Sequence, residues 1–160
     1  MADTLKDAIK QAFAADATLS TMTGPFTDGW QNMEDGEWWR MSQVRSPNYN
    51  RFLGHNSDAQ RPYVDRQVFT FSAFCETEDR ADEMSNAMNN LFNNPTVIQP
   101  LTGGGRTLSC QRIGNPTVVH YIPRRSFVAR DSAVDSGNIS ECWIASGTWM
   151  FILQKTLGVN

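Results

Sequence analysis

The chain lacks an apolar run approaching the ~20 residues of a membrane-spanning helix, and its first residues (MADTLKDAIK) lack the apolar stretch of a signal peptide. We therefore expect no membrane segment and synthesis in a cytoplasm. It also lacks a basic surplus: 14 Lys and Arg stand against 17 Asp and Glu, for a net charge of −3. Because nucleic-acid binding requires clustered Lys and Arg, this balance argues against a nucleic-acid surface. The local basic cluster Arg124-Arg125 reads as a strand end or an intersubunit salt-bridge donor.

Residues that carry chemistry are scarce as well. The chain has two histidines: His55 has only Asp58 near it at ligand spacing, and His120 is expected to be a half-buried strand residue with a local hydrogen-bond partner. The three cysteines, Cys75, Cys110 and Cys142, are far apart and form no C-x₂₋₄-C pair, so each is expected to be a buried hydrophobe in a strand. A Gly-x-Ser-x-Gly motif is absent too. The sequence therefore predicts no enzyme: no catalytic residue, no metal ligand and no cofactor site.

What is present is enough apolar material for one core. Hydrophobic residues make up 40% of the 160 residues and charged residues 19%, which is typical of a single globular domain, here spanning 1–160. Apolar residues at helical spacing predict one helix over 4–15 and a second from Thr77 to about Phe92. Asn93-Asn94-Pro95 is expected to end the second helix.

Alternating residues predict the strands. A long one is expected over 63–75, and three antiparallel strands are expected over 107–113, 117–128 and 141–154, with 114–116 as a tight connection. The last is apolar on both faces in its second half, so it should be central. The predicted fold class is α+β: a two-layer sandwich in which two helices pack on one face of an antiparallel sheet of about four strands, ordered as a meander.

Residues 26–61 are predicted to form an aromatic-rich loop insertion, within which Glu37–Val44 could be a strand or a short helix. Such a loop is either a partner-binding segment or a lid over the domain's own core. Aromatic anchors and arginines are the residue types that dominate protein interfaces. The candidate subunit-interface residues are therefore Trp38, Trp39, Arg40, Tyr49, Phe52, Arg124 and Arg125.

The order of elements resembles the tail-completion, or tail-terminator, family of tailed phages. The likeness is carried by the N-terminal helix with the short segment Ala17–Met22, by Arg61-Pro-Tyr-Val64 leading into Phe69–Phe74, by the helix ending at Leu91-Phe92, and by a final strand with Trp149-Met-Phe-Ile152. It covers about residues 4–24 and 61–155. The segments 26–61 and 129–140 are longer than the family's usual loops.

The resemblance implies a structural virion protein that forms a homo-oligomeric, hexameric ring in the tail or neck. Such a ring terminates the tail tube and joins it to the head connector. Its partners would be further copies of the chain, the tail tube protein and the connector or adaptor protein, with DNA passing through the lumen without specific binding. A neck, adaptor or tail-tube subunit is the first alternative. A small-ligand-binding or enzymatic α+β domain, with the aromatic loop as its lid, is the alternative of another class.

Overall fold

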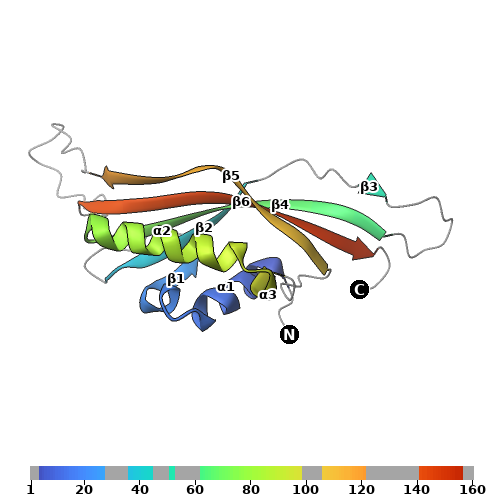
Figure 1. Cartoon of the computed structure of the whole chain (residues 1–160), viewed down its shortest axis with the longest axis horizontal. Coiled ribbons are helices and arrows are strands. Elements are labelled where there is room, and N and C mark those ends of the chain that lie inside the picture. Colours follow the sequence, from blue (N-terminus) through green and yellow to red (C-terminus); the bar gives the residue numbers. More distant parts are fainter. Residues whose placement is uncertain are drawn as a thin grey trace, which may run out of the picture.

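The computed structural model describes residues 4–27, 36–44, 51–52, 62–98, 106–121 and 141–156. Two helical segments precede each of two groups of strands along the chain, and all the strands form one sheet (Figure 1). In chain order the elements are α1 (Leu5–Ala15), the 3₁₀ turn η1 (Leu19–Thr21), β1 (Thr23–Phe26), β2 (Trp38–Val44), β3 (Arg51–Phe52), β4 (Pro62–Cys75), α2 (Glu78–Asn93), α3 (Pro95–Ile98), β5 (Arg106–Tyr121) and β6 (Cys142–Thr156).

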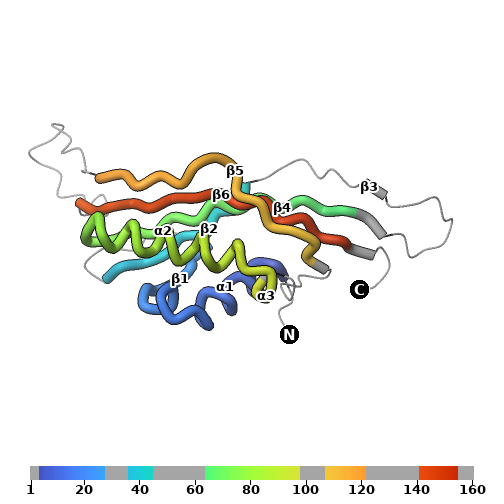
Figure 2. The backbone as a smooth tube through the Cα atoms, viewed as in Figure 1, coloured from blue at the N-terminus to red at the C-terminus, as the bar shows by residue number. Residues whose placement is uncertain are grey.

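The sheet has six strands in the order β1-β2-β4-β6-β5, with β3 paired to β4 on the same side as β2. β1 and β2 are parallel, and every other pair is antiparallel. β4 and β6 form a long pairing at the centre of the sheet. It stays in register from Pro62 opposite Thr156 to Cys75 opposite Trp143. β4 and β6 run most of the length of the described molecule, and β5 bends near its middle (Figure 2).

The α+β class and the central position of the last strand are confirmed, since β6 lies between β4 and β5. The number of strands and their order differ from the prediction. The segments 107–113 and 117–128 were expected to be two strands, but 106–121 is one strand. Residues 114–116 bulge opposite the single residue Gly147, with Gly114 at φ 74°, so the chain slips in register without reversing. The expected meander order is wrong, because β6 returns between β4 and β5.

The helices begin where local capping predicts. The hydroxyl of Thr4 accepts a hydrogen bond from the amide of Asp7 at 3.2 Å, and the hydroxyl of Thr77 accepts one from the amide of Arg80 at 3.3 Å. α2 ends at Asn93, ahead of Pro95, as expected. Each helix then turns its apolar stripe toward the sheet, which places both in one layer.

The core lies between this helix layer and one face of the sheet. Its aromatic centre is continuous: Phe13 of α1 meets Phe71 at a ring distance of 5.5 Å, Phe71 meets Phe92 of α2 at 5.0 Å, and Phe92 meets Trp149 of β6 at 5.0 Å. Gly147 makes room for Trp149, because a Cβ at that position would overlap the indole ring. α1, α2, β4 and β6 are therefore locked together by one ring cluster.

Candidate subunit-interaction surface

The sheet face turned away from α1 and α2 is called the open face below. Directly opposed residues of antiparallel strands share a face, so the register assigns its members. Four rows cross β2, β4, β6 and β5 in that order: Trp38–Phe74–Ile144–Val119, Arg40–Ser72–Ser146–Thr117, Ser42–Thr70–Thr148–Ile113 and Val44–Val68–Met150–Gln111.

Cross-strand hydroxyl pairs hold the middle of the open face. The Oγ1 atoms of Thr70 and Thr148 lie 2.9 Å apart, as do the Oγ atoms of Ser72 and Ser146. All four hydroxyls are partly buried in the described structure and bond to one another. This part of the face is polar yet internally satisfied, so covering it with a partner would leave few unpaired donors.

At one end the open face is closed by the chain's own side chains. Trp38 lies flat on Phe74, with ring centroids 3.9 Å apart and an interplanar angle of 7°. Together with Cys142 they form a small buried cluster, against which Phe26 and Ile144 pack. Trp38 is 1% exposed and therefore presents no indole surface to a partner.

The expectation that both tryptophans serve as surface anchors is corrected here. Trp39 is fully buried on the opposite face, where its ring meets Phe13 edge-on at 5.3 Å. The physical reason is that Glu37–Val44 resolves to a strand from Trp38 onward, so neighbouring side chains point to opposite faces and each tryptophan enters a different cluster. This part of the predicted insertion is a strand of the sheet.

The other predicted interface residues have different positions. Arg40 is half-buried on the open face in register with Ser72. Phe52 lies in β3 opposite Tyr63, and its side chain is outside what the structure describes. Tyr49, Arg124 and Arg125 lie outside the described residues. Their assignment to an interface stays a prediction.

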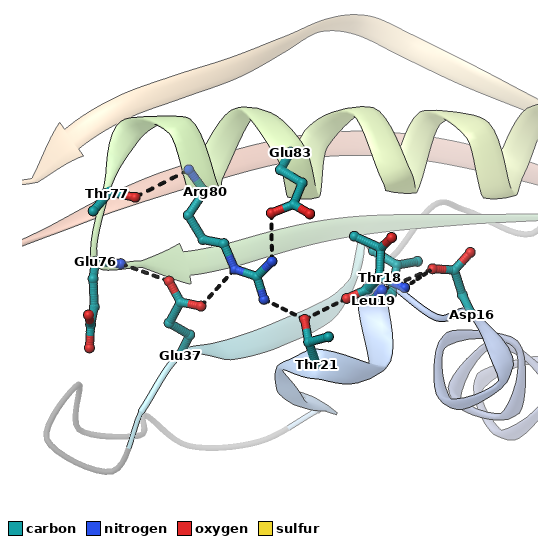
Figure 3. Close-up of polar contacts among 9 residues, drawn as sticks. All are labelled: Asp16, Thr18, Leu19, Thr21, Glu37, Glu76, Thr77, Arg80 and Glu83. Carbon is teal, nitrogen blue, oxygen red and sulfur yellow. Dashed lines mark hydrogen bonds and ion pairs between the residues drawn. The ribbon is translucent and has the colours of Figure 1, made fainter.

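The start of β2 is held against the helix layer by Arg80 (Figure 3). Its Nε lies 2.9 Å from Oε2 of Glu37, its Nη1 lies 2.6 Å from Oε2 of Glu83, and its Nη2 donates to the hydroxyl of Thr21. Glu37 also accepts a hydrogen bond from the amide of Glu76 at 3.1 Å. Burial by itself lowers the pKa of Arg80, but the hydrogen bonds with Glu37 and Glu83 outweigh it and raise the pKa. The Arg80 guanidinium therefore stays charged.

Exposed apolar side chains gather on β5, at the edge of the sheet away from β1 and β2. Of the large hydrophobic residues that the described structure exposes, four belong to β5 and the fifth, Val44, ends β2. The β5 residues are Leu108, Ile113, Val119 and Tyr121, with exposures of 47%, 46%, 55% and 37%. β5 is also the last strand of the described sheet, so its outer edge faces no other described strand. An edge strand that exposes several large apolar side chains offers a surface for contact with another chain.

Sequence reasoning missed these four residues because it treated β5 as two short strands of a meander. A usable signal was present in Val118-Val119. Adjacent strand residues face opposite ways, so if only one face is covered by helices, one of the two valines must lie outside the core. The structure makes Val118 the core residue and Val119 the exposed one. Leu108 is the extra residue of the bulge between Thr107 and Ser109.

Within the described residues, few features could take part in catalysis or ligand binding. His120 stacks on Trp143 at 4.5 Å, and its Nε2 lies 2.8 Å from Oε1 of Glu141. Two surface depressions of about 290 and 330 Å³ flank α2 and are lined mainly by polar residues. In the part of the chain that is described, no group of three or more His, Cys, Asp or Glu could hold a metal ion, and no helix is long and apolar enough to cross a membrane. The absence of catalysis stays a prediction.

The described cysteines behave as apolar residues. All three thiols are free, and Cys75 and Cys142 are buried. Burial raises the pKa of Cys75 to about 12, with the charge of Glu37 acting in the same direction. Burial also raises the pKa of Cys110 to about 12. A neutral, buried thiol is a poor nucleophile and a poor metal ligand.

Comparison of the chain with models of protein families gave no match, and comparison with curated protein sequences gave none either. The resemblance to tail-terminator proteins therefore depends on the order and patterning of the elements alone. The feature of the structure that most directly suggests a function is the apolar edge at β5, which is suited to contact with another protein.

Proposed function

We propose that this chain is a non-enzymatic structural subunit of a homo-oligomeric ring that terminates a phage tail tube and joins it to the head connector. The observation that supports this most is the concentration of exposed large hydrophobic side chains on the edge strand β5. Isolated exposed apolar residues need no explanation, but four on an edge strand whose outer side pairs with no other described strand favour a partner.

The two edges of the sheet suit ring closure. A ring of identical subunits needs two different surfaces that fit each other, and here β5 forms one edge while β1 and the end of β2 form the other. β2 runs parallel to β6, and β5 runs antiparallel to β6, so β2 and β5 point in opposite directions. A rotation about an axis along the strands would place β5 of one copy antiparallel to the β1–β2 edge of the next, which continues the sheet.

The proposal is tested by measuring mass and shape. Size-exclusion chromatography with light scattering should give a single assembly of several subunits, and negative-stain microscopy should show rings. Val119→Lys should shift the chain to monomers without changing its far-UV circular dichroism, because Val119 is 55% exposed and an exposed position on an edge strand tolerates charge. Asn90→Lys, on the exposed side of α2, is the matched control and should assemble normally.

A monomer at high concentration without rings, or equal assembly of the two variants, would contradict the ring. The position in the virion is read from particles that lack this protein. Overlong tails support a terminator, whereas filled heads without tails would assign the chain to a neck adaptor instead.

A further inference from the structure

Two exposed apolar side chains of the open face lie on opposite outer strands of the sheet. Val44, at the end of β2, is 48% exposed, and Ile113, in β5, is 46% exposed. Val44 is in the row that ends at Gln111, and Ile113 is in the adjacent row, which begins at Ser42. The two side chains are thus at nearly the same level along the strands. Three strand spacings, about 14 Å, separate β2 from β5, so Val44 and Ile113 cannot cover each other within one copy.

Only part of β2 has a described strand on its outer side. β1 pairs with β2 from Thr23 opposite Trp38 to Phe26 opposite Arg40, and no described strand pairs with the outer side of 41–44. β1 is itself a poor template for a further strand, because Pro25 has no amide hydrogen to donate. The segment 41–44 contains no proline. It is therefore the part of this edge to which a further strand can be added.

β5 offers a segment of similar length. Its register with β6 shifts at the bulge between Ile113 and Thr117, and the strand bends near its middle (Figure 2). The segment 109–113, before the bulge, pairs with β6 from Ser109 opposite Ile152 to Ile113 opposite Thr148. Its other side pairs with no described strand, and it contains no proline. The part of β5 before the bulge is therefore an edge that matches 41–44 in length.

The register between the two edges follows from the sheet. β2 and β5 run in opposite directions, and a rotation about an axis along the strands keeps residues of equal level beside each other. The opposed pairs across such a junction are Ile113 with Ser42, Arg112 with Gln43, and Gln111 with Val44. Ile113 and Val44 then become diagonal neighbours on the open face, with Cα atoms about 7–8 Å apart, a distance that longer side chains span.

The side chains that this register brings together are compatible. Among the residues of 41–44 and 109–113, Arg112 is the single charged one, so no like charges oppose each other and no carboxylate is buried. Arg112 and Gln43 are both exposed, on the face that the helices cover. The Nη1 of Arg112 donates to Asn89 at 3.1 Å, and a guanidinium has further N–H groups that the amide oxygen of Gln43 can accept.

We propose that residues 109–113 of β5 add to residues 41–44 of β2 in a neighbouring copy, antiparallel and with Gln111 opposite Val44. The inference rests on the proposed ring, because it requires two different edges of identical subunits to meet. It adds to the ring the two segments that pair and their register. Val119, beyond the bulge, is level with Trp38 and so lies toward β1 of the next copy. Each junction covers both Val44 and Ile113.

Disulfide trapping tests the register. Directly opposed residues of antiparallel strands have Cα atoms about 4.5–5.5 Å apart, which a disulfide can span. The Val44→Cys/Gln111→Cys chain, oxidised with copper phenanthroline, should give a ladder of bands above one chain on a non-reducing gel. An equal mixture of the two single variants should give dimers only. Val44→Cys/Arg112→Cys is the matched control and should stay at the mass of one chain, because residue 112 is on the other face.

The parent chain, with its own three cysteines, gives the background of the gel. A charge exchange tests the same register without oxidation. Val44→Lys should weaken assembly, and adding Gln111→Glu should lower the dissociation constant again by about 2- to 5-fold, since opposite charges on directly opposed residues attract. Val44→Lys/Asn90→Glu, with the same charges but the acid on α2, should show no such rescue.

Rings without a ladder and without charge rescue would overturn this junction and leave the ring standing. A ladder of equal strength from Val44→Cys/Arg112→Cys would overturn the register. A ladder that continues without a largest closed species would support the pairing and contradict a closed ring. Monomers at every concentration, with no ladder, would overturn both proposals.

Discussion

The guanidinium of Arg80, in the first turn of α2, and the carboxylate of Glu37, just before β2, form an ion pair at 2.9 Å although 43 residues separate them. Their side chains are 23% and 19% exposed, so water screens the pair only in part. Through Thr21, the same arginine also reaches η1, so one side chain ties the N-terminal segment, the start of β2 and the helix layer together.

Arg80→Ala should therefore lower the free energy of unfolding by about 1–2 kcal/mol, because it leaves Glu37 without its charged partner. For a chain of this length, each kcal/mol corresponds to about 2–4 °C in Tm. Thermal and urea unfolding measure the loss. Arg112→Ala, which removes one exposed hydrogen bond to Asn89, is the control and should cost less than about 0.5 kcal/mol. Equal losses would show that the contacts of Arg80 with Glu37, Glu83 and Thr21 contribute nothing specific to stability.

Gly147→Ala should destabilise the chain by about 1–3 kcal/mol, since the new methyl group overlaps the Trp149 ring and also approaches the end of Met88. The neighbouring change Ser146→Ala, on the open face, removes one hydroxyl pair and should cost less. A double-mutant cycle with Trp149→Phe provides the decisive measurement. The smaller ring should relieve part of the cost, so additive losses would contradict the predicted overlap.

Trp39→Ala should cost about 3–5 kcal/mol in the unfolding of the free subunit, as expected for removal of a fully buried indole. Val44→Ala in the same strand, at 48% exposure, should be within about 0.5 kcal/mol of the parent chain. Urea unfolding at a concentration where the chain is dissociated gives both values. If the Trp39→Ala subunit is as stable as the parent chain but fails to assemble, Trp39 is an interface residue and its assignment to the core is wrong.

The buried thiols predict a loss of stability at alkaline pH. The pKa of Cys75 and of Cys110 is raised in the folded chain from 9.0 to about 12, so folding favours the neutral thiol. Their contribution is fully present below pH 9 and is lost as pH rises from 9 toward 12, because the unfolded chain releases these protons first. Urea unfolding in the presence of a reducing agent, from pH 8 to 10.5, measures the slope.

A Cys75→Ala/Cys110→Ala variant controls for the lysines and tyrosines, which also titrate in this range. It should show a shallower decline in stability with pH than the parent chain. Identical slopes would mean that the two thiols are accessible to water in the folded state, in conflict with the burial of Cys75 and the half-burial of Cys110.

Much of the fold could be predicted because its signals are local. Thr4 and Thr77 cap helices through contacts three residues away, and the alternation over 63–75 shows which residues share a face. The central position of β6 was predicted from the unbroken apolar run in its second half. The structure buries one face of this strand and leaves the other half-buried. The conformation of residues 114–116 was not predictable from their Gly and Pro, because these residues suit a reversing turn as well as a bulge. Pairing of both flanking segments with β6 makes this segment a bulge.

The candidate surface was predicted less well, for a related reason. Trp38 and Trp39 look alike in sequence as aromatic anchors, and only their strand pairing sends one to Phe74 and the other to Phe13. Likewise, predicting that Val119 is exposed while Val118 packs against the core requires knowing which face of the sheet the helices cover.

By itself, the sequence determined the helices α1 and α2, the strands β4 and β6, the α+β class and the lack of chemical motifs, since these follow from contacts within a few residues of the chain. Tertiary structure alone decided which residues meet across the sheet. Ser72 and Ser146 are 74 residues apart in the chain and form a hydroxyl pair only through the register of β4 and β6. Register depends on pairings between distant segments, and a shift of one residue would turn every side chain to the other face.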